Sequence, residues 1–118
     1  MIVAGIGCRR GCRADEIVAL VREAEALAGP VDALAAPAFK RDEPGLLEAA
    51  LRLGLVVRFV TAEALSAAQE DCVTFSDVVE RTTGFASIAE AAALAGGGSL
   101  VLPRIASDHA TCAVASVP

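Results

Sequence analysis

The chain has 118 residues, a formal net charge of −5, 55% hydrophobic residues and no Trp or Tyr. This length suits one domain, residues 1–118, with a single core, and the acidic balance argues against nucleic acid as a partner. No apolar run approaches the ~20 residues of a membrane span and no signal peptide is visible, so a cytoplasmic protein without a membrane partner is expected.

The N-terminal stretch predicts a strand, a glycine-rich turn and a helix. An apolar strand, Met1 to Ala4, precedes Gly5-Ile6-Gly7-Cys8-Arg9-Arg10-Gly11. Glycines permit positive φ and bring backbone N–H groups close to a ligand, and a helix N-terminus beyond such a turn attracts anions. Two arginines add planar donors that suit carboxylate or phosphate. We therefore predict an anion-recognising loop at the edge of a sheet.

Two familiar nucleotide motifs do not fit this loop. Gly11 falls one residue late for GxGxxG, and no Gly-Lys-Ser/Thr follows, so neither NAD nor ATP is predicted and no cofactor is expected. Strand-turn-helix loops with glycines are also common in α/β domains that bind nothing there, and spacing alone leaves that alternative open.

The next predicted elements alternate between helix and strand. In chain order they are a helix from Asp15 to Ala28, a strand from Val31 to Ala35, a helix from Pro44 to Leu53 and a strand from Leu55 to Val60. The second helix is expected to bury Leu47, Ala50 and Leu51. The loop between Pro37 and Gly45 follows a strand, where open α/β sheets place their ligands.

The second half of the chain predicts two short helices and a hairpin. Thr61 suits the N-cap of a helix that ends near Gln69, and residues 76–81 suit a helical turn. Ser87 and Glu90 fit a capping box before a helix of small residues that ends near Ala95. The last elements are a strand over 100–102, a loop over 103–110 and an antiparallel strand over 111–117. We predict an α/β fold, a three-layer α/β/α domain with a mixed, mainly parallel sheet of about five strands.

Metal chemistry is not predicted from the cysteines. The chain contains four of them, none in a CxxC pair: Cys8, Cys12, Cys72 and Cys112. The only histidine is His109, so a zinc or iron–sulfur site has no support. Cys8 lies near arginines and a predicted helix N-terminus, which would lower its pKa and make it a candidate nucleophile.

Several stretches in combination suggest a family. They are the glycine-rich segment over 5–11, Lys40-Arg41-Asp42-Glu43-Pro44-Gly45-Leu46, the helix over 87–94, and the strands over 102–104 and 110–115. Together they resemble the cobalamin-biosynthesis family that comprises CobE and the C-terminal domain of CbiG, over essentially the whole chain. The resemblance implies an α/β/α fold, a place in the corrin-ring pathway of vitamin B12 and binding of a corrinoid (tetrapyrrole) intermediate as carrier or accessory factor.

The same resemblance leaves two alternatives open. Full-length CbiG-type proteins open a lactone on a cobalt-corrin precursor, so a hydrolase or ring-modifying activity on a precorrin is one. A docking module for other B12-pathway enzymes is the other. The oligomeric state and the identity of the intermediate also stay open.

Corrin precursors are flat and apolar at the ring, with carboxylates around the rim, so a matching site needs an apolar shelf and several cationic or N–H donors. The predicted ligand-binding residues are Gly5, Gly7, Cys8, Arg9, Arg10, Gly11, Lys40, Gly45, Ser87 and Arg104. Phe39 is a candidate ring face, and Arg104 stands where the family usually has lysine. The candidates for catalysis are Glu43, Glu90 and His109. A local pair with Lys40 is the alternative for Glu43, whereas a helix cap is favoured for Glu90 and a surface position for His109.

Overall fold

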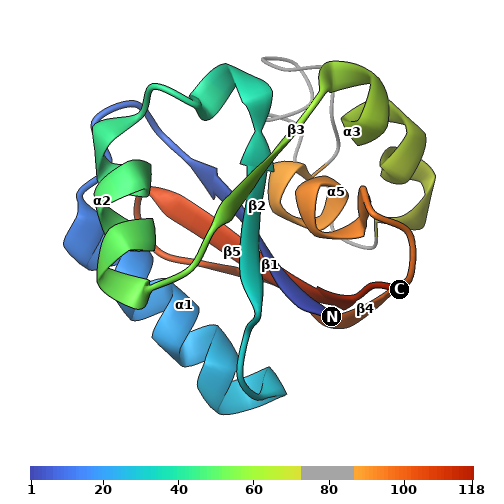
Figure 1. The fold of residues 1–118 in the computed structure, drawn as a ribbon, viewed down its shortest axis with the longest axis horizontal. Helices are drawn as coiled ribbons and strands as arrows, with labels where there is room; N and C mark the ends of the chain where they lie inside the picture. Colours follow the sequence, from blue (N-terminus) through green and yellow to red (C-terminus); the bar gives the residue numbers. More distant parts are fainter. Residues whose placement is uncertain (73–86) are drawn as a thin grey trace.

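The computed structural model describes residues 1–72 and 87–118, and it shows a twisted five-stranded sheet with helices around it (Figure 1). The strands are β1 (Ile2–Cys8), β2 (Ala33–Pro37), β3 (Val57–Val60), β4 (Ser99–Ala106) and β5 (Ala110–Ser116). The helices are α1 (Ala14–Ala28), α2 (Pro44–Leu53), α3 (Ala62–Ala68) and α5 (Ile88–Leu94), with short 3-10 turns η1 (Ala38–Lys40) and η2 (Gln69–Asp71).

The sheet is mixed, as predicted, and its strand order is β3-β2-β1-β5-β4. β1 pairs with β2, and β2 with β3, in parallel, whereas β5 is antiparallel to both β1 and β4. β4 therefore runs in the same direction as β1, β2 and β3, and β5 alone among the described strands opposes them. The carboxyl ends of these four strands meet at one edge of the sheet, which we call the carboxyl edge.

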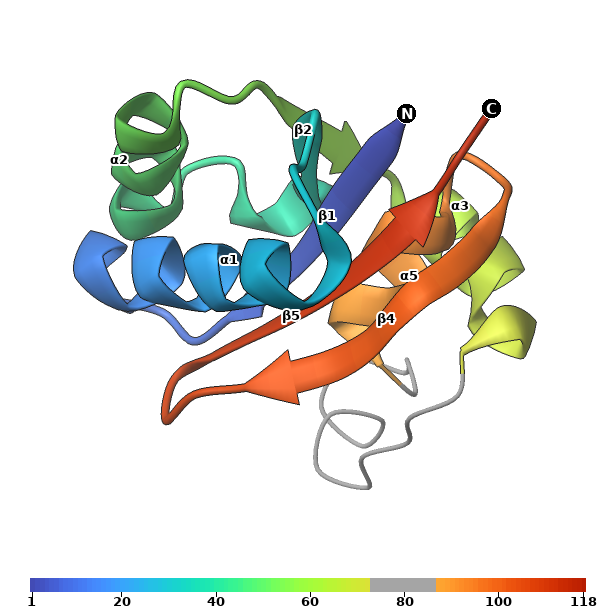
Figure 2. The same cartoon turned by 90° about the horizontal axis from the view of Figure 1, so that it is seen from below.

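Helices cover both faces of the sheet, which confirms the predicted three layers (Figure 2). On one face, α1 and α2 bury Ile17 and Leu46 against Leu34 of β2. On the other, α3 and α5 pack Leu65 and the alanines of α5 against the sheet. None of the described helices is long and apolar enough to cross a membrane.

Two of the three glycines assigned to the first turn lie instead within a strand. β1 continues to Cys8, so Gly5 and Gly7 are strand residues, and the predicted turn over 5–11 is wrong at both. A Cβ atom on Gly5 would overlap the carbonyl oxygen of Ala89 and lie 2.6 Å from the backbone nitrogen of Ala93. These glycines therefore let α5 pack directly on β1, a close approach that its small residues predict.

The helix caps agree with the sequence, whereas the burial of α2 does not. The Thr61 hydroxyl accepts a hydrogen bond from the N–H of Ala64 at 3.1 Å, and α3 begins as predicted. On α2, Leu51 is 83% exposed and Leu47 40%, while Leu46 is fully buried. Ala50 is buried as predicted, but the rest of the buried face of α2 is shifted by about one residue from the prediction, because Gly45 packs against the Cys12 backbone and fixes the rotation of the helix.

The last hairpin is longer than predicted. Residues 103–106, predicted as a loop, belong to β4. Pro103 is tolerated there because β4 is an edge strand, where a missing N–H breaks no ladder bond inside the sheet. The predicted antiparallel pairing with the last strand is confirmed. The helical turn predicted over 76–81 lies outside the described residues.

The packing of α5 on β1 predicts that Gly5→Ala is strongly destabilising. The new methyl group meets backbone atoms, which cannot rotate away, so we expect a loss of about 3 kcal/mol, the upper end of the usual cost of overpacking. Gly96→Ala is the control, because a Cβ there lies 3.8 Å from its nearest neighbour, Val117. Urea unfolding measures both; equal midpoints for the two variants would contradict this account of the β1 glycines.

Candidate functional site

A tight turn at the end of β1 displays two arginines. The Cys12 N–H donates to the carbonyl oxygen of Arg9 at 3.0 Å, and Gly11, the third residue of this turn, has φ 79°. Positive φ at that position is the mark of a type II turn and favours glycine. Arg9 and Arg10 are exposed, and we call residues 9–12 the arginine turn. Of the three glycines in the predicted loop, only Gly11 serves the backbone conformation expected of it.

The loop after β2 contributes an exposed aromatic ring and a paired lysine. Phe39, in η1, is 57% exposed. The Lys40 ammonium nitrogen lies 3.7 Å from Glu43 Oε1, and Glu43 Oε2 accepts the Gly11 N–H at 3.1 Å. The local Lys40–Glu43 pair that the sequence allows is therefore present, and Glu43 also connects this loop to the arginine turn.

The N-terminus of α5 and the end of β4 meet at the carboxyl edge. The Ser87 hydroxyl accepts the Glu90 N–H at 3.4 Å, as the capping box predicts. The Glu90 carboxylate is fully buried, and its Oε2 accepts the backbone N–H of Arg104 at 2.9 Å. Glu90 therefore links α5 to β4.

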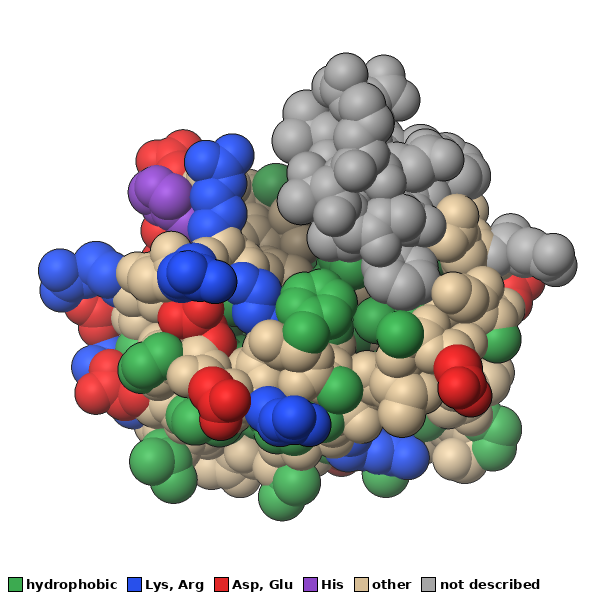
Figure 3. Space-filling model, turned by 90° about the horizontal axis from the view of Figure 1, so that it is seen from above, with side chains coloured by type: hydrophobic (Ala, Val, Ile, Leu, Met, Phe, Trp, Pro, Cys, Tyr) green, Lys and Arg blue, Asp and Glu red, His purple; other side chains and the backbone are tan. Residues whose placement is uncertain are grey.

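The carboxyl edge carries guanidinium groups that form no ion pair with the residues that the structure describes. Among the described residues, Arg9, Arg10 and Arg104 form no ion pair, and neither does exposed Arg41. Viewed onto this edge, lysine and arginine side chains gather on one part of the surface, interspersed with acidic side chains and next to hydrophobic ones (Figure 3). Arg41 is absent from the sequence-based prediction, although its place beside Lys40 in a loop after a strand is the signal that would have found it.

The Cys8 thiol does not have the properties predicted for it. Burial raises its pKa to about 11, an effect that the nearby Lys40 charge only partly opposes. The predicted decrease in pKa is wrong, because the loss of solvent around the thiol outweighs the effect of the nearby positive charge. At neutral pH Cys8 is therefore a neutral thiol, which argues against a nucleophilic role.

His109 binds a carboxylate that sequence reasoning missed. Its Nδ1 lies 2.9 Å from Glu16 Oε1, and its backbone N–H donates to Glu16 Oε2 at 2.6 Å. The Ser107 hydroxyl donates to the same Oε2, so Glu16 on α1 holds the tip of the β4–β5 hairpin. No local pattern reveals Glu16, because it lies 93 positions from His109 in the sequence. The carbonyl oxygen of His109 accepts the Arg9 N–H at 2.9 Å, so this tip also supports the arginine turn.

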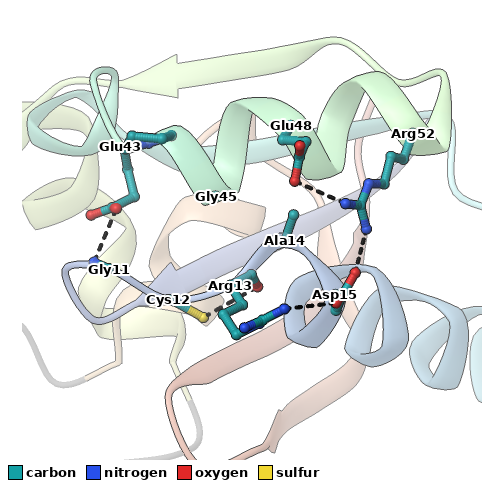
Figure 4. A pocket seen from close by; sticks show the side chains of 10 residues that line it. Gly11, Cys12, Arg13, Ala14, Asp15, Glu43, Gly45, Glu48 and Arg52 are labelled. Carbon is teal, nitrogen blue, oxygen red and sulfur yellow. Dashed lines mark hydrogen bonds and ion pairs between the residues drawn. The ribbon is translucent and has the colours of Figure 1, made fainter.

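A cleft of about 340 Å³ lies between the N-terminal ends of α1 and α2 (Figure 4). Its lining carries more carboxylates than guanidinium groups, because Glu43 lines it as well. Arg52 contacts Asp15 and Glu48, and Arg13 contacts Asp15. The cleft therefore offers no net positive charge to an anionic ligand, unlike the carboxyl edge. Within the described part of the chain, no group of three or more acidic, His or Cys side chains is placed to hold a metal ion.

The Glu16 contacts predict a pH-dependent stability. Hydrogen bonds from Ser107 and His109 lower the Glu16 pKa from 4.5 to about 2. Because the folded-state pKa is depressed, the stabilisation is complete above the unfolded-state value and is lost as the pH falls from about 4.5 to 2. We expect the thermal midpoint of the wild type to exceed that of Glu16→Gln at pH 6, and the two to converge near pH 2. A difference that is unchanged over this range would contradict the assignment.

Comparisons with known proteins show which family the chain resembles. A family model described as Cobalamin synthesis G C-terminus matches residues 2–115. Protein CobE of Sinorhizobium sp is 36% identical over 121 residues, with 97% of this chain and 79% of that protein covered. A crystal structure of CobE, described as a protein from the cobalamin (vitamin B12) biosynthetic pathway, is similar with a TM-score of 0.88 and 39% identity, covering 100% of this chain and 91% of that chain.

A longer relative contains the same region. The cobalt-precorrin-5A hydrolase of Priestia megaterium is 31% identical over 124 residues, a match that covers 100% of this chain and 33% of that enzyme. The family model spans nearly the whole chain, and the fold is that of the CobE crystal structure. The chain therefore belongs to the CobE and CbiG C-terminal family of cobalamin-biosynthesis proteins.

Proposed function

We propose that this protein binds a corrinoid intermediate of cobalamin biosynthesis at the carboxyl edge and acts as its carrier or as an accessory factor. The observation that carries the proposal is a group of arginines on that edge that form no ion pair with any described residue: Arg9, Arg10 and Arg104. Guanidinium groups bind carboxylates through two parallel hydrogen bonds. The carboxylate-rich rim of a corrin precursor supplies several such partners.

An exposed ring complements these charges. Phe39 is 57% exposed beside the cationic side chains, and it offers an apolar face to the flat macrocycle. A ring face together with guanidinium groups suits the flat ring and the carboxylate rim of a corrin precursor.

The contacts of the candidate catalytic residues favour a carrier over an enzyme. Glu43 and Glu90 are buried and hold backbone N–H groups of other segments, and His109 is bound to Glu16. Glu43 and Glu90 therefore each have a structural partner that a catalytic role would require them to leave. The Glu16 contact holds His109 only at Nδ1, an arrangement that also orients histidines in enzymes.

A hydrolase or ring-modifying activity on a precorrin is the second candidate, and the observation in its favour is the cobalt-precorrin-5A hydrolase that contains a similar region. This chain spans about a third of that enzyme's length. The two functions differ in the fate of the ligand: a carrier returns the pigment unchanged, whereas an enzyme changes its mass.

The proposal predicts that the double variant Arg9→Ala/Arg10→Ala binds hydrogenobyrinic acid at least about tenfold more weakly than the wild type, because each charge-assisted hydrogen bond contributes about 1.5–3 kcal/mol. Visible absorbance and the thermal midpoint follow the titration together. The control is Arg22→Ala/Arg58→Ala, which removes the same charge from exposed positions on α1 and β3.

Equal weakening in both double variants would contradict a site at the arginine turn, because it would mean that net charge alone matters. Mass spectrometry of the recovered pigment separates a carrier from an enzyme. If wild-type protein binds no pigment but retains a pathway enzyme in a pull-down, the docking module replaces the carrier.

A further inference from the structure

Glu43 occupies an unusual place for a carboxylate next to an anion-binding surface. It is 8% exposed, in the loop between η1 and α2, and both of its oxygens face groups of this chain. Oε2 accepts the Gly11 N–H at 3.1 Å, and Oε1 lies 3.7 Å from the Lys40 ammonium nitrogen (Figure 4 shows the contact with Gly11). A buried negative charge here opposes the binding of a polyanion unless it contributes something else.

The contact with Gly11 completes a set of restraints on the arginine turn. Arg9 is held at its N–H by His109, and Cys12 closes the turn onto Arg9. A Cβ atom on Gly45 would overlap the carbonyl oxygen of Cys12, so α2 also packs directly against the end of the turn. Glu43 supplies the remaining restraint, at the residue that immediately follows the two arginines.

We infer that Glu43 is a positioning residue: its carboxylate fixes the arginine turn and Lys40 relative to each other, and so sets the spacing of ligand carboxylates that the carboxyl edge accepts. This inference rests on the proposed function and reassigns Glu43 from candidate catalyst to support. It also gives Lys40 and the two arginines different roles. Lys40 is held by Glu43, whereas Arg9 and Arg10 keep their guanidinium groups available while their backbone is fixed.

The direction in which Glu43→Gln changes the affinity for an anionic ligand distinguishes a positioning role from a purely electrostatic effect. Glu43→Gln removes a negative charge near the site, so electrostatics alone predicts tighter binding of an anion. Loss of the charge-assisted bond to Gly11 predicts weaker binding, because the arginine turn is then free to sample other conformations. Asp42→Asn is the matched control, because Asp42 is the exposed neighbour of Glu43 and its substitution removes the same charge.

The experiment compares wild type, Glu43→Gln, Glu43→Ala and Asp42→Asn. Amide hydrogen exchange at Gly11 is measured first, without ligand. We expect exchange at least tenfold faster in Glu43→Ala and no change in Asp42→Asn. Acetylation of Lys40, the single lysine of the chain, is expected to speed up in both Glu43 variants because its partner charge is gone. Affinity for hydrogenobyrinic acid is expected to fall at least fivefold in both and to stay equal or rise in Asp42→Asn.

Two results would overturn the inference: Gly11 exchange in a folded Glu43 variant that matches the wild type, or tighter pigment binding in Glu43→Gln. Circular dichroism verifies folding, and Glu43→Gln carries the comparison if Glu43→Ala does not fold. A wild type that binds no pigment overturns the proposed function instead, and exchange at Gly11 then decides the role of Glu43 without any ligand.

Discussion

The contact between α5 and β1 is the constraint on which the carboxyl edge depends. Because Gly5 has no side chain, the backbone of α5 lies directly on the strand, and every residue from Ala89 to Leu94 is buried. This contact places the start of α5 beside the end of β1, where Glu90 reaches the backbone of Arg104. A larger residue at Gly5 would move α5 outward and separate Glu90 from the backbone of Arg104.

Buried or partly buried carboxylates organise this edge through backbone groups. Glu90 binds Arg104, Glu43 binds Gly11, and Glu16 holds the hairpin tip that supports Arg9. In each case a carboxylate accepts a hydrogen bond from a backbone N–H group. The segment that donates this bond either contains an arginine of the carboxyl edge or contacts one. The guanidinium groups of the described arginines at this edge are thereby left without an ion pair, which gives an acidic protein a local cationic surface.

Local signals in the sequence were sufficient for most of the fold. The caps Thr61 and Ser87, the stop at Gly54 and the small residues of α5 predicted real features, because each acts within a few residues. The predicted turn was wrong at Gly5 and Gly7 because glycine suits a turn and a close helix contact equally well. Only the tertiary structure distinguishes the two roles. The local sequence predicted that Arg9, Arg10 and Lys40 follow the ends of strands, whereas the contact of Glu16 with His109 depends on a long-range approach that no local pattern encodes.

The most direct test is to identify the residues that a bound corrinoid contacts. Backbone amide signals of ¹⁵N-labelled protein would be followed by NMR during a titration with hydrogenobyrinic acid. We expect the largest shifts at residues 9–11, at Phe39 to Arg41 and at Arg104, all on the carboxyl edge. Shifts centred instead on the cleft between α1 and α2, around Asp15 and Glu48, would contradict it, as would a spectrum that the pigment does not change.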